Sequence, residues 1–229
     1  MPVSAPETIM LDTLLKSPRL PFYAQRIQAL LADEAERRTH FVATAHEDEK
    51  TEFINGENIV RSPVKFKHNV AVGNLFSLLK AHVMAHQLGW VGVETILVSL
   101  TRNDYEPDLC FFTATTAAGF RPDQMRFPAP DFVVEVLSAS TAANDRGVKF
   151  DDYAAHGVPE YWIIDPDTET VEQYRLAGEL YELAIKAQTG DLRSLAVPGF
   201  VIPVRAIFDD EINRSTLREL LVESRYSAR

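Results

Sequence analysis

The stretch EVLSASTAANDRGVKFDDYAAHGVPEYWIID, residues 135–165, decides the fold class. An apolar strand-like run ends around Glu135, residues 142–156 have helical spacing and stop at Gly157, and EYWIID forms a second strand-like run. A buried carboxylate at a strand end and a lysine, Lys149, on the next helix are costly to desolvate unless they are paired. The pattern therefore indicates either a buried salt bridge or a metal site.

The remaining elements follow from hydrophobic spacing and turn residues. We expect helices over 22–39, 68–87 and 142–156, and a short last helix over 216–224, where Thr216 and Glu219 have capping-box spacing. A hairpin is expected over 51–60, with its turn at Asn55-Gly56. Strands are expected over 90–100, 107–114, 131–138 and 160–165, and an antiparallel pair over 169–176 and 181–187. Gly89 is the expected C-terminal cap of the second helix. The order predicts an α/β fold with a mixed sheet flanked by helices.

Composition narrows the class of protein. The 229 residues suit one domain with appendages, and 46% of them are hydrophobic, which is ordinary for a globular protein. The net charge of −10 argues against coating nucleic acid by bulk attraction, but it leaves room for a local basic groove. The single cysteine, Cys110, favours a cytoplasmic protein without an internal disulfide. The apolar stretch LAVPGFVIPV is short and interrupted by prolines, so we expect no membrane span.

Acidic residues near strand ends are the main candidates for chemistry. Asp108 directly precedes the apolar run LCFF, whereas Asp131 shares a strand and a face with Glu135. A divalent cation needs carboxylates that converge from different directions, so Asp108 and Glu135 form the better pair. Lys149 lies on the following helix, with Tyr153 one turn later on the same face, where the phenol could hold the ammonium in place. The alternative interpretation is structural: a buried Lys149–Glu135 ion pair, with Asp108 capping a turn.

Several segments resemble a known family. They are TEFINGENIV, SPVKFKHN, EPDLCFF, APDFVVEVLSAST, DRGVKFDDYAAHGVPEYWIIDP and VPGFVIPVRAIF. Together with the order Pro-Asp, Glu, Lys, they resemble the PD-(D/E)XK nuclease superfamily and, more narrowly, the Uma-type family of restriction-endonuclease-like proteins. The resemblance spans roughly residues 50–208. It implies three parts: an N-terminal helical extension over 1–45, a restriction-endonuclease-like α/β domain over 46–208, and a C-terminal helix over 209–229.

The resemblance also implies a set of site residues. It makes Asp108, Glu135 and the Val136 carbonyl the ligands of Mg²⁺ or Mn²⁺, and it makes Lys149 the catalytic lysine. The superfamily's usual lysine position, two residues after the acid, holds Leu137 here, so the lysine has moved to the next helix. The resemblance also suggests Glu52 and His68 as auxiliary residues beside the site. The i+4 spacing from Lys149 adds Tyr153 as an auxiliary residue. Arg61, Lys65 and Lys67 are expected to contact nucleic acid because they precede the second helix, whose N-terminus suits phosphate.

The expected function is a metal-dependent endonuclease. Its substrate would be nucleic acid, most plausibly DNA, and a homodimer would supply the two sites that double-strand cleavage needs. Two other classes fit the same residues. One is a catalytically silent nuclease-fold protein that acts in binding or assembly, and the other is a metal-dependent phosphodiesterase acting on small nucleotides. Divalent-metal binding distinguishes the first of these from a working nuclease, and comparing plasmid with nucleotide substrates distinguishes the second.

Overall fold

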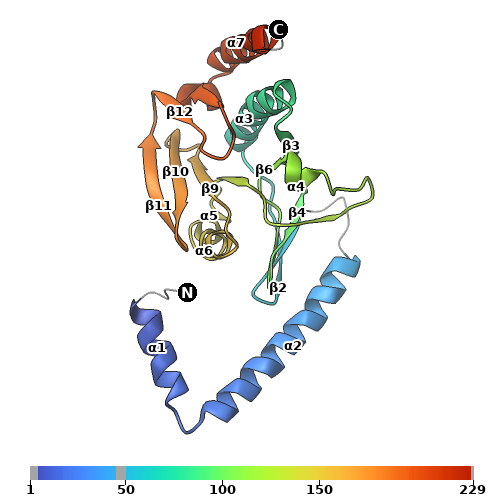
Figure 1. Ribbon diagram of the computed structural model, residues 1–229, viewed down its shortest axis with the longest axis vertical. Helices are drawn as coiled ribbons and strands as arrows, with labels where there is room; N and C mark the ends of the chain where they lie inside the picture. The colour runs from blue at the N-terminus through green and yellow to red at the C-terminus, as the bar shows by residue number, and fades with distance from the viewer. Residues whose placement is uncertain (1–4, 45–49, 228–229) are drawn as a thin grey trace.

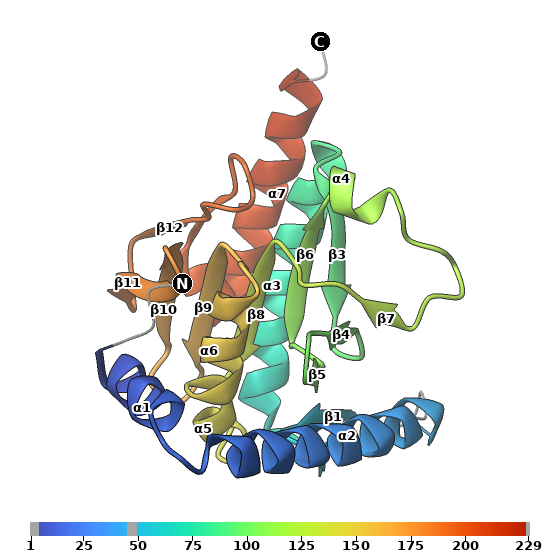
Figure 2. The ribbon, with the colours of Figure 1, turned by 60° about the horizontal axis from the view of Figure 1, so that its bottom comes forward.

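A six-stranded mixed sheet forms the centre of the computed structural model, which describes residues 5–44 and 50–227. Its strands are β3 (Gly89–Val93), β6 (Leu109–Thr113), β8 (Phe132–Val136), β9 (Glu160–Asp165), β10 (Thr170–Ala177) and β11 (Leu180–Ala187), in the spatial order β11-β10-β9-β8-β6-β3. Only β8 and β9 pair in parallel. Helices α3 (Phe66–Ala85) and α7 (Asp210–Ser227) cover one face, and α5 (Ala142–Asp145) and α6 (Val148–Ala155) cover the other (Figures 1 and 2). The expected α/β fold is confirmed.

Burial on both faces explains why β8 is a continuous apolar run. Val134 and Val136 pack into the core with α3, whereas Val133 packs into the core with α6. Side chains alternate between the faces of a strand, so Glu135 lies on the same face as Val133. The single charged residue of this strand therefore points towards the layer that contains α6 and Lys149.

A second, smaller sheet lies beside the α6 layer. It consists of β1 (Thr51–Ile54), β2 (Glu57–Val60), β4 (Leu97–Ser99), β5 (Asp104–Tyr105) and β7 (Arg126–Phe127), in the order β2-β1-β5-β4-β7. The predicted hairpin is confirmed, with Asn55 and Gly56 both at positive φ. Ile54 and Tyr105 share a core with Val133 and Tyr153, which brings this sheet against the charged face of β8. Four short elements complete the chain: α4 (Ala114–Ala117), β12 (Asp191–Arg193), β13 (Val201–Pro203) and a 3-10 helix, η1 (Val204–Ile207).

Two helices at the N-terminus project from this body (Figure 1). They are α1 (Ala5–Leu15) and α2 (Leu20–Thr44). The C-terminal part of α2 is anchored, because Glu34 pairs with Arg102 and Phe41 is buried beside the small sheet. The expected N-terminal helical extension is therefore present. The proposed domain boundary at residues 45 and 46 lies outside the described residues, and the three-part division stays a prediction.

Several element boundaries differ from the sequence-based expectations. The single strand expected over 90–100 is two strands, β3 and β4, in different sheets, because Glu94 takes a positive φ of 61° between them. Gly89 opens β3 instead of capping α3. A Cβ on Gly89 would lie 2.0 Å from the Phe112 carbonyl oxygen, so close backbone approach explains the glycine. The left-handed residue after α3 is Gln87.

The last two predicted helices also have bounds that differ from the expectation. The helix expected over 142–156 is interrupted at Gly147 and forms α5 and α6. The last helix begins earlier than Thr216, because the Asp209 carboxylate accepts the backbone N–H groups of Glu211 and Ile212 and so caps α7. In the part of the chain that the structure describes, no helix combines the length and the apolar character that a membrane crossing requires.

Candidate active site

Strand pairing brings Asp108 and Glu135 together. Leu109 of β6 pairs with Val134 of β8 in an antiparallel register, so continuing the register by one residue sets Asp108 opposite Glu135. The Val136 N–H donates to Asp108 Oδ2 at 2.7 Å. Both carboxylates are fully buried on the face that points towards α6. The convergence expected from sequence is therefore present.

Lys149 lies at the centre of this face. Its Nζ is 3.0 Å from Glu135 Oε1, 2.8 Å from Glu52 Oε1 and 3.1 Å from Asp145 Oδ1, and the side chain has no exposed surface. We call Glu52, Asp108, Glu135 and Asp145 the carboxylate cluster. The ion pair of the structural interpretation is thus present as well, extended to three acids.

Tyr153 does not do what the sequence suggested. Among the described residues its hydroxyl has no hydrogen-bond partner, the ammonium of Lys149 included, so the expectation that it holds the lysine is wrong. The ring instead packs between Tyr105 and Tyr161, with centroid distances of 5.3 and 5.6 Å. The residue one helical turn away that does contact Lys149 is Asp145, four positions before it.

Arg61 contacts the carboxylate cluster and does not belong to a surface patch. Its guanidinium donates to both oxygens of Glu52, at 3.2 and 2.7 Å, and lies 3.8 Å from both Asp108 Oδ1 and Glu135 Oε2. The expected grouping of Arg61 with Lys65 and Lys67 as one basic segment is therefore corrected. Glu52 also accepts the N–H of Glu106, so this auxiliary residue ties the hairpin to the site.

Two further basic groups face Asp108. Lys50 Nζ is 2.9 Å from Asp108 Oδ1 and 2.7 Å from Glu94 Oε2. His68, in the first turn of α3, places Nε2 3.4 Å from Asp108 Oδ2, while its buried Nδ1 has no hydrogen-bond partner. His68 therefore lies beside the site, as expected.

The surroundings of Asp108 and Glu135 shift their pKa values in opposite directions. Burial alone would raise the pKa of Asp108, but the hydrogen bond to His68 and the charge of Lys50 hold it well below its usual range. Burial dominates at Glu135 and raises its pKa to about 8, with Asp145 adding to the effect and Lys149 opposing it. Asp108 thus stays ionised, while Glu135 can hold a proton near neutral pH. Such divergence is typical of catalytic sites.

The donor chemistry fits a hard divalent cation. Carboxylate oxygens are the ligands that Mg²⁺ and Mn²⁺ prefer, and Glu135 Oε2 is a buried oxygen without a hydrogen-bond donor. Among the described residues, however, no three His, Cys, Asp or Glu side chains are arranged to hold an ion. Lys50 and Arg61 lie where further ligands to Asp108 would have to come from. A cation would therefore have to compete with these two basic side chains.

Lys65 and Lys67 remain at the surface, next to the site. Lys65 is the N-cap residue of α3, and no side chain caps this helix. Lys67 forms an ion pair with Asp167. Both line a cavity of about 240 Å³, together with His68 and the hydroxyl-bearing residues Ser138 and Ser140. This cavity adjoins the carboxylate cluster through His68.

Sequence reasoning missed Asp145 and Lys50. Asp145 stands four residues before Lys149, and that spacing was a usable signal. Lys50 carried no such signal, because its contact with Asp108 joins residues 58 positions apart.

Comparison with known proteins agrees with this geometry. A family model named Uma2 and described as "Putative restriction endonuclease" matches residues 33–205. The chain belongs to the Uma2 family. The Uma2 match contains every residue of the carboxylate cluster and begins within α2, so α1 and the first half of α2 lie outside it.

A curated relative and a solved structure extend the comparison. An uncharacterised protein of Synechocystis sp., sll1609, is 30% identical over 133 residues, which cover 57% of this chain and 75% of that protein. A crystal structure from Anabaena variabilis, described as a putative nuclease belonging to DUF820, has a TM-score of 0.64 at 19% identity. It covers 77% of this chain and 96% of its own. This second likeness confirms the fold expected from the superfamily resemblance.

Proposed function

We propose that this Uma2 protein is a Mg²⁺- or Mn²⁺-dependent endonuclease that hydrolyses phosphodiester bonds, with DNA as the substrate, in the cytoplasm. The observation that carries the proposal is the convergence of Asp108, Glu135 and Lys149 on one face, where Glu135 Oε2 accepts no hydrogen bond from the described residues. Membership of a family described as putative restriction endonucleases supports the reaction class.

Each residue has a distinct part in this proposal. Asp108, Glu135 and the Val136 carbonyl would hold the cation, which when bound polarises a phosphate oxygen and lowers the pKa of the attacking water. Lys149 offsets the negative charge that develops on the phosphate and keeps Glu135 in place through the 3.0 Å contact. Glu52 and Asp145 fix the position of Lys149 in turn.

Cleavage of supercoiled plasmid with Mg²⁺ or Mn²⁺ tests the reaction. We expect nicked and linear products from the parent and at least a 10²-fold lower rate from Glu135→Gln, which removes a cation ligand. The exposed Glu182→Gln is the matched control and should cleave as the parent does. Single nucleotides offered in the same assay test the phosphodiesterase alternative. If Glu135→Gln and the parent cleave equally, the activity does not come from this site.

A binding-only protein is the second candidate, and one observation favours it. Lys50 and Arg61 already neutralise Asp108, so the cluster is stable without a cation. A thermal-shift titration distinguishes the two, because a ligand that binds only the folded state raises the melting temperature. We expect Mn²⁺ to raise the melting temperature of the parent and not that of an Asp108→Asn variant. An unchanged melting temperature with retained DNA binding would favour the binding protein.

Lys65 and Lys67 are proposed to hold the phosphate backbone beside the site. Each phosphate neutralised on duplex DNA contributes a slope of about 0.9 to the dependence of log affinity on log salt. Replacing both lysines with glutamine should therefore reduce that slope by roughly 1.8. The pair Lys16→Gln and Lys186→Gln, remote from the site, is the charge-matched control. An unchanged slope in the Lys65/Lys67 variant would return both residues to ordinary surface charge.

The functional unit is proposed to be a homodimer built on α2. Its body-facing stripe, Phe41, Arg38 and Glu34, continues towards the N-terminus at steps of three and four residues as Leu31, Ile27 and Tyr23. These three side chains are 46%, 50% and 38% exposed. An apolar seam with this spacing suits a second helix of the same kind. Two chains joined this way would supply two active sites for the two strands of a duplex.

A further inference from the structure

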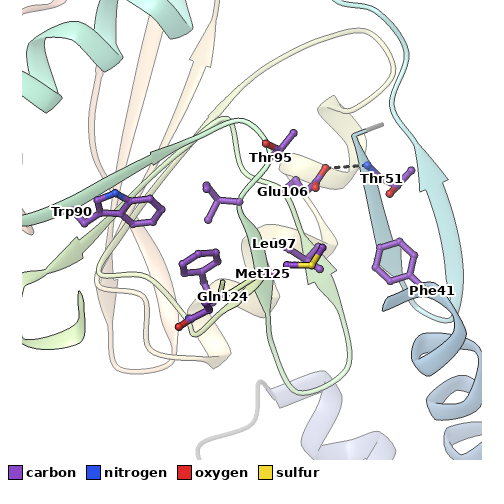
Figure 3. Close-up of a pocket in the computed structure, with 10 residues that line it drawn as sticks. Phe41, Thr51, Trp90, Thr95, Leu97, Glu106, Gln124 and Met125 are labelled. Atoms are coloured by element: carbon purple, nitrogen blue, oxygen red, sulfur yellow. Dashed lines mark hydrogen bonds between the residues drawn. The ribbon is translucent and has the colours of Figure 1, made fainter. Parts of the chain in front are cut away.

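A second cavity lies directly beside the carboxylate cluster. Its volume is about 410 Å³, which is within the range of small-molecule sites. Figure 3 shows Trp90 at one end and Phe41 at the other, with Leu97 and Met125 between them and Glu106 at one side. The cavity is formed by α2, β3, the small sheet and the segment before β7.

The apolar walls are rigid and aromatic. Trp90 stacks on Phe127, with a centroid distance of 5.4 Å and an angle of 20° between the rings, and on Phe112, at 5.8 Å and 26°. Phe120 packs edge-on against both rings, at 5.9 Å from Trp90 and 5.1 Å from Phe127. Flat aromatic walls bind flat aromatic ligands by stacking, and Met125, 53% exposed, can adjust over such a ligand.

Glu106 is the one charged side chain that lines this cavity among the described residues. Its Oε2 accepts the Thr51 N–H at 2.9 Å, which fixes the carboxylate. In the part of the chain that the structure describes, Oε1 receives no hydrogen bond. Burial raises the pKa of Glu106 to about 7, so the group is mainly ionised above that pH. A fixed carboxylate with spare acceptor positions selects a ligand that presents adjacent N–H donors.

The cavity and the carboxylate cluster share a wall. Consecutive residues Lys50 and Thr51 contact Asp108 and Glu106, and the Glu106 N–H donates to Glu52 Oε1 at 2.9 Å. Hydrogen bonds through Thr51 and Glu52 therefore connect the Glu106 side of the cavity to the carboxylate cluster.

We propose that this cavity binds a guanine base of the nucleic-acid strand, with its Watson–Crick edge on Glu106 and its ring against the aromatic wall. Guanine presents N1–H and the 2-amino group side by side, and a carboxylate accepts both, whereas thymine presents a carbonyl on each side of its single N–H. The base must be unpaired to enter, as in other sites that read this edge. The inference rests on the proposed function only in that the ligand belongs to a nucleic acid.

Tryptophan fluorescence provides a test that needs neither metal nor cleavage. The chain has two tryptophans, and Trp162 is fully buried, so a stacking ligand in the cavity quenches Trp90. We expect dGMP to quench the emission saturably. Binding of dIMP, which lacks the 2-amino group, and of dTMP should each be weaker by about tenfold or more, the scale of one charge-assisted hydrogen bond.

Variants identify the residues responsible. Glu106→Gln keeps an acceptor for the Thr51 N–H but loses the charge, so its affinity for dGMP should fall by about tenfold or more. Glu57→Gln, exposed on β2, is the matched control and should bind as the parent does. Trp90→Phe should abolish the quenching signal while the protein stays folded by circular dichroism.

Two outcomes would overturn the inference: equal affinities for dGMP and dTMP, or dGMP binding unchanged in Glu106→Gln. Saturable, Glu106-dependent binding of dGMP by a protein that never cleaves plasmid would support the cavity while contradicting the proposed nuclease. Plasmid cleavage without dGMP quenching would do the reverse.

Discussion

Lys149 stabilises the fold in addition to its proposed role in catalysis, because it forms ion pairs with three buried carboxylates. Replacing it with alanine leaves Glu52 and Asp145 without that counter-charge. Removing one partner of a buried ionic group typically costs about 3–5 kcal/mol. We therefore expect Lys149→Ala to lower the free energy of unfolding in urea by about 3 kcal/mol or more. Lys186→Ala, which breaks an ion pair whose lysine is 60% exposed, should cost no more than about 1 kcal/mol.

The same variant bears on catalysis if it is assayed below its lowered melting temperature. With the electrostatic contribution of Lys149 gone, plasmid cleavage should fall by about 10²-fold while Mn²⁺ still raises the melting temperature. Unchanged cleavage by folded Lys149→Ala would make this lysine purely structural.

Cys110 provides a residue-scale check on the packing of β6. Its thiol is fully buried, and burial raises its pKa well above the usual range, so the reactive thiolate is scarce and inaccessible. We expect no reaction of the native protein with a thiol reagent over hours, and one thiol per chain in denaturing urea. Rapid labelling of the native protein would show that β6 opens readily.

How far the sequence predicted the site depends on the range of each contact. Asp108, Glu135 and Lys149 could be found because strand alternation and one helix limit where their side chains point. Arg61 could not be placed by the same reasoning. Its partners Asp108 and Glu135 lie far along the chain, and a lone arginine before a helix is usually a surface residue. Only tertiary structure puts it among the acids.

At the scale of elements, periodicity found the strands and helices but not the breaks within them. Residues 90–100 are mostly apolar, and the polar pair Glu94-Thr95 within them does not by itself mark Glu94 as a left-handed residue that ends β3. The helix over 142–156 was interrupted at Gly147, where a Cβ would lie 2.8 Å from the Ala143 carbonyl oxygen. Glycine in a helix costs stability but does not by itself indicate a break.

The break between α5 and α6 is held to the sheet by an ion pair. Arg146 at the break donates to both oxygens of Glu172 on β10, at 2.6 and 3.2 Å. Although burial alone would raise the pKa of Glu172, the hydrogen bonds from Arg146, Lys186 and Tyr174 lower it to about 2. A carboxyl with a lowered pKa stabilises the fold above its unfolded pKa, and that contribution is lost as the pH falls through the folded value.

The pH dependence of the unfolding free energy of one variant tests the Arg146–Glu172 ion pair. The difference in unfolding free energy between the parent and Glu172→Gln should be constant above about pH 5, because the carboxyl is then ionised in both states. It should shrink as the pH falls from about 4.5 towards 2. Chemical denaturation at several pH values measures it, with the exposed Glu182→Gln as the control. A difference that persists unchanged at pH 2 would mean that the ion pair does not stabilise the break.

At the scale of the whole molecule, the N-terminal arm, which consists of α1 and of α2 up to residue 32, projects from the rest of the chain, the body. The body is built around two cores on the faces of one sheet, whereas α2 runs along the lower edge of the body in Figure 2. The apolar stripe of α2 continues from Glu34 to the exposed residues Leu31, Ile27 and Tyr23. The Uma2 match starts at residue 33, where this exposed stripe ends. The arm before residue 33 therefore lies outside the matched region, and its exposed apolar side chains are what the proposed dimer would bury.

Charge placed on the stripe should separate the chains. We expect the parent to be a dimer by size-exclusion chromatography with light scattering, and the double variant Ile27→Glu and Leu31→Glu to be a monomer, because two acids per chain would face each other across the seam. The double variant Gln25→Glu and Gln28→Glu adds the same charge to exposed positions of α2 off the stripe and should remain a dimer. All four residues are exposed, so both variants should keep the parent's melting temperature to within the loss of dimer linkage. A parent that is monomeric at tens of micromolar, or a stripe variant that stays dimeric, would place the interface elsewhere. If the monomer nicks plasmid but no longer linearises it, the arm is what couples the two proposed active sites on the two strands.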